Sequence, residues 1–245
     1  MFESQIRSIV HQFIQQTNPQ WRPILAMALD SMDQNYLYEL TEQRDWLPGL
    51  DKIFAAFSRP LDELRYILLG ESPYPRVQSA NGYAFWDNAV GDLWSDKGLS
   101  KPVNRATSLR NFIKMLLVAR GDLSITQLNQ DAIAALDKKP YYATGNQLFT
   151  ALLDKGFVLL NATLVFRKDR VQEDARQWRP FIHSILQLLA SQKSSATLLL
   201  LGRIAAQVSG VEQFACLRAE HPYNVSFITN PEVLQFFQPL DLLAR

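Results

Sequence analysis

The chain has 245 residues, of which 47% are hydrophobic and 20% are charged, and its formal net charge is +1. This composition is ordinary for a globular protein. Because no charge run and no Gly/Ser/Pro-rich linker divides the chain, we expect a single domain over residues 1–245. No apolar run approaches the roughly 18 residues of a membrane span. The total charge does not indicate a nucleic-acid partner, which would need local clusters of basic residues.

Cysteine and histidine are rare in this chain. The single cysteine, Cys216, cannot form an internal disulfide, and the chain starts without the pattern of a signal peptide, so we expect a cytoplasmic protein. Cys216 lies in an apolar run and is expected to pack in the core. His11, His183 and His221 lack metal-ligand spacing, so we expect no metal. No GxGxxG or GxxxxGK[ST] fingerprint indicates a nucleotide cofactor, and we expect none.

The N-terminal part is expected to be helical. Apolar residues recur at helical spacing between Phe2 and Ile14, which predicts an amphipathic helix within residues 1–20. Packing on the body of the protein and binding a partner both fit this helix. Helical periodicity continues over residues 21–40, and a short helix is expected over 50–57.

The first predicted strand runs over residues 66–69 and breaks at Gly70 into a polar loop. A short apolar run stopped by Gly and Pro is typical of a buried strand that feeds a loop. Residues 87–102 are polar, so we expect an exposed loop there. A helix then opens at Ser108, for which two roles fit: the N-cap of that helix, or a phosphate contact at its N-terminus.

The rest of the chain alternates between helices and apolar strands. Strands are expected over residues 157–160, 197–201 and 214–218. Helices are expected over 132–136, 148–155, 178–189 and 231–237, with a charged loop over 167–174. This alternation implies a three-layer α/β/α fold with a central, mainly parallel four-stranded sheet.

The strands end on polar residues: Glu71, Asn161, Arg203 and His221 follow the four predicted strands in turn. The carboxyl ends of parallel strands meet at one edge of a sheet, and ligands bind outside that edge. The sequence therefore predicts a site where these four loops converge.

Segments around these loops resemble motifs of the uracil-DNA glycosylase superfamily, most closely its first family. Residues 70–85, GESPYPRVQSANGYAF, align without a gap to the family's GQDPYHGPGQAHGLAF-type motif. VNRATSLRNF takes the place of its Pro-rich segment before a helix. LLNATLVFR, LLLG and HPYNVS are similar to LLLN-T-x-L-T-V-R, LLWG and HPSPLS. The resemblance, which holds from about residue 21 to the C-terminus, implies the glycosylase fold and cleavage of the N-glycosidic bond of a flipped uracil in DNA.

The resemblance implies roles for five residues. Asn161 matches the residue that hydrogen-bonds the uracil edge, and Phe85 the aromatic that stacks on the base. Tyr74 matches the ring that excludes the thymine methyl, and His221 the donor to charge that develops on uracil O2. Val225 matches the wedge that enters the duplex, although it is smaller than the family's Leu. A strand-end turn for Asn161 and plain core packing for Phe85 are the alternatives.

Contacts with DNA are expected to go mainly to phosphates. Loop position and the resemblance make Ser108, Arg203 and Arg167 the first choices. Further candidates are Arg76, Arg105, Arg110, Lys168 and Arg170. The partner that we expect is uracil-containing or otherwise damaged DNA, bound by a monomer.

Departures from the family motif argue against family-like catalysis. The family's catalytic Asp is Ser72, and a serine cannot supply a carboxylate's charge. Pro75 and Asn81 replace the two motif histidines. Residues 70–73 resemble the Gly-Glu-x-Pro motif of other branches of the superfamily, so either Glu71 holds the attacking water or it is an exposed loop carboxylate. A glycosylase with weakened or altered catalysis, an inactive homologue that binds DNA or a protein, and an unrelated small-molecule binder remain as alternatives.

Overall fold

A parallel sheet forms the centre of the computed structural model, which describes residues 14–192 and 194–245. Its strands are β1 (Tyr66–Gly70), β4 (Phe157–Asn161), β5 (Thr197–Leu201) and β6 (Ala215–Ala219). They are parallel and lie in the order β4-β1-β5-β6. The predicted strands and their parallel arrangement are confirmed.

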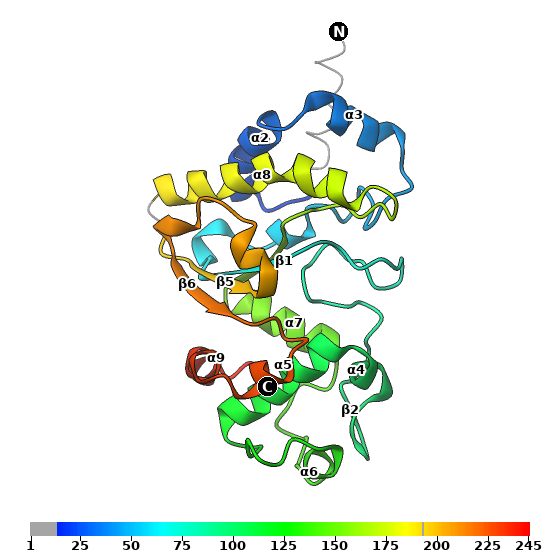
Figure 1. Cartoon of the computed structure of the whole chain (residues 1–245), viewed down its shortest axis with the longest axis vertical. Helices are drawn as coiled ribbons and strands as arrows, with labels where there is room; N and C mark the ends of the chain where they lie inside the picture. Colours follow the sequence, from blue (N-terminus) through cyan, green and yellow to red (C-terminus); the bar gives the residue numbers. More distant parts are fainter. Residues whose placement is uncertain (1–13, 193) are drawn as a thin grey trace.

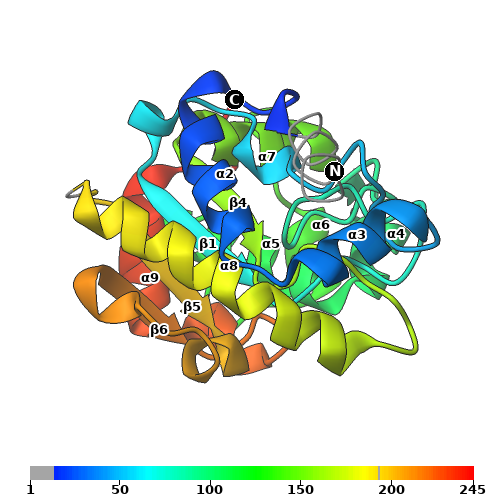
Figure 2. The ribbon, with the colours of Figure 1, turned by 90° about the horizontal axis from the view of Figure 1, so that it is seen from above.

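Helices cover both faces of the sheet (Figures 1 and 2). One layer contains α2 (Arg22–Asp30), α3 (Gln34–Glu42) and α8 (Val171–Ser191), and the other α5 (Thr107–Arg120), α7 (Gly145–Asp154) and α9 (Pro231–Phe237). Each layer of helices encloses a hydrophobic core with one face of the sheet: the first core lies under α2, α3 and α8, and the second under α5, α7 and α9. Successive side chains of a strand point to opposite faces, so Ile67 and Leu69 belong to the first core and Leu68 to the second. Because both faces are covered, β1, β4 and β5 are almost entirely apolar and buried, whereas the edge strand β6 is more exposed, and the predicted three-layer α/β/α fold is confirmed.

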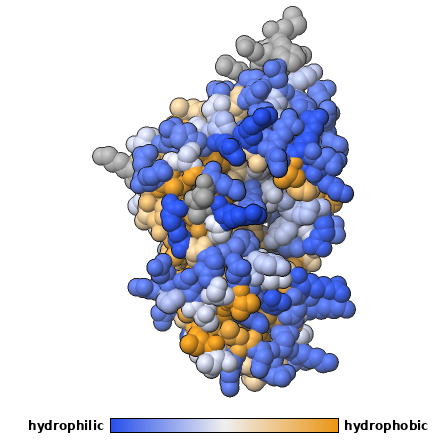
Figure 3. All heavy atoms as spheres, in the orientation of Figure 1, coloured by the Kyte–Doolittle hydropathy of each residue, from blue (hydrophilic) through white to orange (hydrophobic). Residues whose placement is uncertain are grey.

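Smaller elements complete the second layer. They are the short helices α4 (Lys101–Arg105) and α6 (Gln130–Ala134) and a hairpin of β2 (Trp94–Ser95) and β3 (Gly98–Leu99). Among the described residues, no helix has the length and apolar character needed to cross a membrane. Hydrophilic residues cover most of the face drawn in Figure 3.

The N-terminal prediction is only partly testable. Apart from Ile14, which is buried, the predicted helix between Phe2 and Ile14 lies outside the described residues. The helical periodicity expected over 21–40 is confirmed, and it is divided between two helices, because α2 ends at Asp30 and α3 begins at Gln34. Asp33 caps α3 by accepting from the backbone N–H groups of Asn35 and Tyr36. The segment 50–57 is mostly turn, with a 3-10 helix over Ala55–Phe57.

Two loop predictions also need correction. The segment 87–102 is not simply exposed, because it contains the β2–β3 hairpin and the buried side chains of Leu93 and Leu99. The charged loop expected over 167–174 ends early, since α8 already begins at Val171. Glu173 and Asp174 lie in its first turn, where carboxylates interact favourably with the helix dipole.

Three further details concern helix ends and Cys216. Helix α5 begins at Thr107, and its N-cap Ala106 provides no side-chain hydrogen bond, so Ser108 is not the cap but lies in the first turn. The predicted stop at Gly156 is confirmed, because this glycine takes the left-handed conformation directly after α7, with φ +84°. Cys216 is only partly buried, and it packs at the margin of the first core.

Candidate active site

The carboxyl ends of the four parallel strands bring the predicted loops to one edge of the sheet. Gly70 and Asn161 are register partners at the ends of β1 and β4. The ladder continues past them, because the Ala162 N–H donates to Gly70 O at 2.9 Å and the Thr163 N–H to Glu71 O at 3.0 Å. These bonds fix the backbone of Glu71 beside Asn161.

Asn161 is a buried amide at the end of β4, with 3% of its surface exposed. A Cβ on Gly70 would lie 2.7 Å from Asn161 Oδ1 and 2.8 Å from Ala84 Cβ, so glycine is needed for the amide to lie there. An amide offers an acceptor and a donor side by side. At this place Asn161 is suited to recognise a complementary pair of groups on a base edge.

His221 follows β6 and packs against the end of β5. Gly202 has φ +78°, and a Cβ on it would lie 2.8 Å from His221 Cβ. The Tyr223 N–H donates to His221 Nδ1 at 3.1 Å. Because Nδ1 accepts this bond, a neutral imidazole carries its proton on Nε2.

The environment of His221 favours its neutral form. Burial lowers the pKa of the imidazole, and the charge of Glu71 opposes this shift only in part. His221 is therefore suited to donate a hydrogen bond from Nε2 without being a cation.

Phe85 and Tyr74 form the aromatic wall of the site. The Phe85 ring stacks on the imidazole of His221, with ring centroids 5.6 Å apart and an interplanar angle of 25°. Phe85 has φ +63°, which is rare for a bulky residue, and strained backbone of this kind clusters at functional sites. The Tyr74 hydroxyl donates to Phe85 O at 3.2 Å and so helps to hold this conformation.

An ion pair between exposed Arg76 and buried Asp87 anchors the same loop. Asp87 is 4% exposed and pairs with Arg76 at 3.0 Å. Its other oxygen accepts from the Ala89 N–H at 2.9 Å. Burial and the charge of Asp87 raise the pKa of Tyr74, so the phenol keeps its proton. The wall of the site is thus held by contacts within one loop.

Glu71 and Ser72 occupy the positions where this chain departs from the family motif. The side chain of Glu71 is exposed and that of Ser72 is partly exposed. Both border a cavity of about 220 Å³ that also touches Thr163, His183 and Ile204. The negative charge of Glu71 acts to raise the pKa of His221, against the larger effect of burial. Glu71 is therefore both open to solvent and next to the site.

Ser108, Arg203 and Val225 lie around this edge. Ser108 lines a groove of about 500 Å³ together with Arg105 and Tyr223. Arg203 is exposed and directly follows Gly202. Val225 is 65% exposed. Their positions are compatible with contacts to DNA outside the base pocket.

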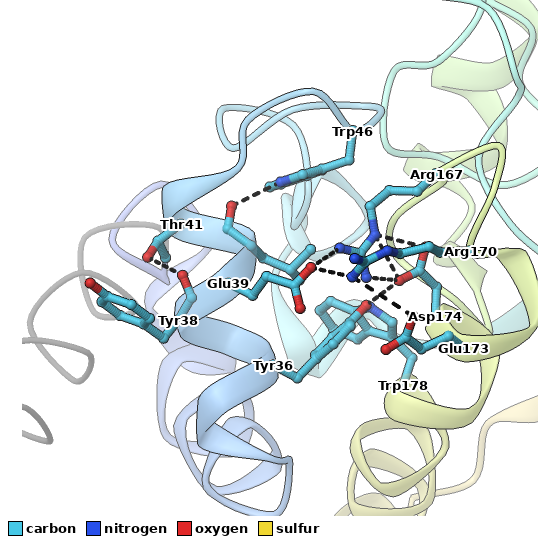
Figure 4. A network of polar contacts seen from close by, with 11 residues as sticks. Tyr36, Tyr38, Glu39, Thr41, Trp46, Arg167, Arg170, Glu173, Asp174 and Trp178 are labelled. Carbon is cyan, nitrogen blue, oxygen red and sulfur yellow. Dashed lines mark hydrogen bonds and ion pairs between the residues drawn. The ribbon is translucent and has the colours of Figure 1, made fainter.

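Arg167 differs from the other expected DNA contacts because it points into the protein (Figure 4). It is 7% exposed and bonds Asp174 at 2.6 Å and Glu39 at 2.7 Å. The Tyr36 hydroxyl also donates to Asp174, and the Trp178 indole N–H donates to Tyr36. The guanidinium thus joins α3 to α8. Because it is buried and paired, Arg167 is not the DNA contact that the sequence led us to expect.

Sequence reasoning missed two residues near the site. Tyr223 is 66% exposed beside the groove, and Asn111 is a buried amide on α5 whose side chain reaches the segment after His221. An amide inside an apolar helical stripe is a poor helix former, and that is the signal that the sequence offers for Asn111.

Comparisons with known proteins agree with this geometry. The chain is similar to the uracil-DNA glycosylases of Corynebacterium glutamicum (24% identity, 84% of this chain and 80% of the relative) and Sulfurimonas denitrificans (28%, 84% and 82%). It superposes on the crystal structure of wild-type UNG from Nitratifractor salsuginis with a TM-score of 0.91 and 39% identity, covering 99% of this chain and 98% of the other.

Mimivirus uracil-DNA glycosylase shares the fold, with a TM-score of 0.55 and 16% identity over 84% of this chain and 68% of the other. A search of family models finds no match. Sequence identity of 39% over nearly the whole of both chains goes beyond a shared fold. The chain belongs to the uracil-DNA glycosylase superfamily.

Proposed function

We propose that this protein is a uracil-DNA glycosylase that hydrolyses the N-glycosidic bond of a deoxyuridine flipped out of DNA, the first step of base-excision repair. One observation carries the proposal: the Asn161 amide and a neutral His221 lie at the same sheet edge, with the Phe85 ring packed on the imidazole. Together they provide an amide that can hydrogen-bond the edge of a base, an imidazole that can donate a hydrogen bond, and an aromatic ring on which a base can stack.

In the proposed complex each group has one task. Asn161 reads the uracil edge, Phe85 stacks on the ring, and Tyr74 blocks the space that a 5-methyl group would need. His221 Nε2–H donates to O2, where negative charge develops as the bond breaks. A donor aimed at developing charge stabilises the transition state more than the ground state.

Glu71 is the proposed partner of the attacking water. The water oxygen bonds to C1′ of the sugar, the C1′–N1 bond breaks, and its electron pair leaves on uracil. The water proton passes to the Glu71 carboxylate. The place of Glu71 supports this role, because its backbone carbonyl accepts from the Thr163 N–H at 3.0 Å, two residues after Asn161. Ser72 cannot replace it, since its hydroxyl is neutral.

DNA is held mainly outside the base pocket. Ser108 and Arg203 are proposed phosphate contacts and Val225 the residue that enters the duplex, on the grounds of their exposure around the site. With a net charge of only +1, binding depends on these local groups. We further propose a single domain over residues 1–245 that acts as a cytoplasmic monomer.

A single-turnover assay with enzyme in excess tests the proposal on uracil-containing single-stranded and duplex DNA. We expect Glu71→Gln, which keeps the side-chain shape, to slow cleavage by about a hundredfold to ten-thousandfold, as for loss of a general base. Glu63→Gln is the matched control, because Glu63 is exposed and lies before β1, at the opposite end of that strand. Ser72→Ala should stay close to the wild type.

An inactive homologue that binds DNA or a protein is the second candidate, favoured by the Ser72 position and the exposure of Glu71. It predicts no cleavage by the wild type and a gain of cleavage by Ser72→Asp. Equal rates for Glu71→Gln and Glu63→Gln would reject Glu71 as the carboxylate while leaving the glycosylase intact.

A further inference from the structure

Asn111 is a polar residue in the apolar interior between α5 and the segment that carries His221. It is 1% exposed, although its neighbours in the helical stripe are apolar. Asn is a poor helix former, and a buried amide is costly unless its polar atoms are bonded. Asn111 is therefore disfavoured at this position unless its bonds compensate.

Both ends of the Asn111 amide have partners. Nδ2 donates to Pro222 O at 2.7 Å and to Tyr223 O at 3.2 Å, and Oδ1 accepts from Arg110 Nε at 3.3 Å. These bonds determine which end of the amide is nitrogen. Nδ2 thus faces the two carbonyl groups that follow His221.

The Pro222 carbonyl and the Tyr223 N–H belong to one peptide group. Asn111 holds the oxygen end of this group, and its N–H end donates to His221 Nδ1 at 3.1 Å. A peptide group is planar, so fixing its oxygen also fixes the direction of its N–H. Hydrogen bonds in such a chain also polarise one another.

We propose that Asn111 is a positioning residue for His221, acting through the Pro222–Tyr223 peptide group to keep Nδ1 an acceptor and the proton on Nε2. This inference rests on the proposed function, because the Nε2 donor is the group that faces the base. Asn111 itself is 1% exposed, so it acts through the peptide group and not by contact with DNA. Its effect is to hold the imidazole in one tautomer and one orientation.

Asn111→Asp tests the relay with little change of shape. A carboxylate oxygen would replace Nδ2 opposite two carbonyl groups, so the peptide group would turn away and Nδ1 would lose its donor. We expect the single-turnover rate to fall at least tenfold while the Kd for uracil-containing DNA changes less than threefold. Asn111→Ser adds no charge, and its hydroxyl ends one bond short of the position of Nδ2, so it also releases the peptide group and serves if the Asp variant does not fold.

Titration of His221 gives a readout that needs no catalysis. Without the Tyr223 N–H, Nδ1 is easier to protonate, so the pKa of His221 should rise toward its ordinary value. Glu71 is the charged group that acts on His221, and it is unchanged in these variants. Because Asn111→Asp adds a carboxylate that would itself raise the pKa, the pKa is read in Asn111→Ser and the tautomer in both variants. NMR of 15N-labelled histidine, with the His221 signal assigned by His221→Gln, follows both the tautomer and the pKa.

Asn129→Ala is the matched control, because Asn129 only caps α6 by accepting from the Ala132 N–H at 2.9 Å. It should leave the His221 signal unchanged. A folded Asn111→Asp or Asn111→Ser variant with wild-type His221 tautomer and pKa would overturn the inference. If the wild type cleaves no uracil but the His221 signal moves as expected, the proposed function fails and the relay stands.

Discussion

Adding one methyl group at Gly202 should lower the cleavage rate much more than the loss of stability explains. The φ of +78° at Gly202 costs a residue with a Cβ roughly 1–2 kcal/mol. In Gly202→Ala the added Cβ would also lie 2.8 Å from His221 Cβ, a distance at which one of the two must shift. The substitution therefore combines a backbone penalty with displacement of the proposed donor.

Gly121 provides a control with the same backbone penalty and no clash. It ends α5 with φ +85°, and a Cβ there would meet nothing within 4 Å. In a chain of this size, 1 kcal/mol changes Tm by about 2–4 °C, so we expect both alanine variants to lose roughly 2–8 °C. Only Gly202→Ala should also lose activity, by about a hundredfold, as for a misplacement of about 1 Å.

Thermal unfolding followed by circular dichroism measures the change in Tm, and single-turnover cleavage of uracil-containing DNA at 25 °C measures the change in activity. Both variants are mostly folded at that temperature if the stability loss is as small as expected. Equal cleavage rates for Gly202→Ala and Gly121→Ala would show that contact with Gly202 does not position His221 for the reaction.

Three further predictions concern charge and the DNA surface. Cleavage uses neutral His221, and burial lowers the pKa of this residue, so the rate should fall only when the pH drops below the ordinary histidine pKa of 6.5. An acid-side midpoint of the pH–rate profile at or above pH 6.5 would contradict this. Arg167→Met leaves the buried Asp174 carboxylate without its partner and should cost about 3–5 kcal/mol in urea unfolding, with no loss of DNA affinity, whereas Arg203→Met should weaken DNA binding without loss of stability. Val225→Leu, at a 65% exposed position, should speed cleavage of duplex more than of single-stranded substrate, and an equal effect on both would argue against a wedge.

The sequence by itself determined the layers of the fold and which loops follow its strands. Short apolar runs that alternate with amphipathic helices are typical of a parallel sheet covered on both faces, so the order of elements predicts the sheet and the side on which the loops after its strands lie. These are local patterns, and each residue's place follows from the strand that it ends.

Only the tertiary structure decided the contacts of Arg167 and Asn111 and the position of Ser108 in its helix. Arg167 follows the Asn161 motif in a charged segment, which is typical of a phosphate contact, yet its partner Glu39 lies 128 residues away in the sequence. Asn111 likewise bonds a carbonyl 111 residues away. Ala106, and not Ser108, is the N-cap of α5, because Ala106 is also the residue at which α4 ends. Side-chain pairing across layers depends on how the helices pack on the sheet, and no local pattern contains that information.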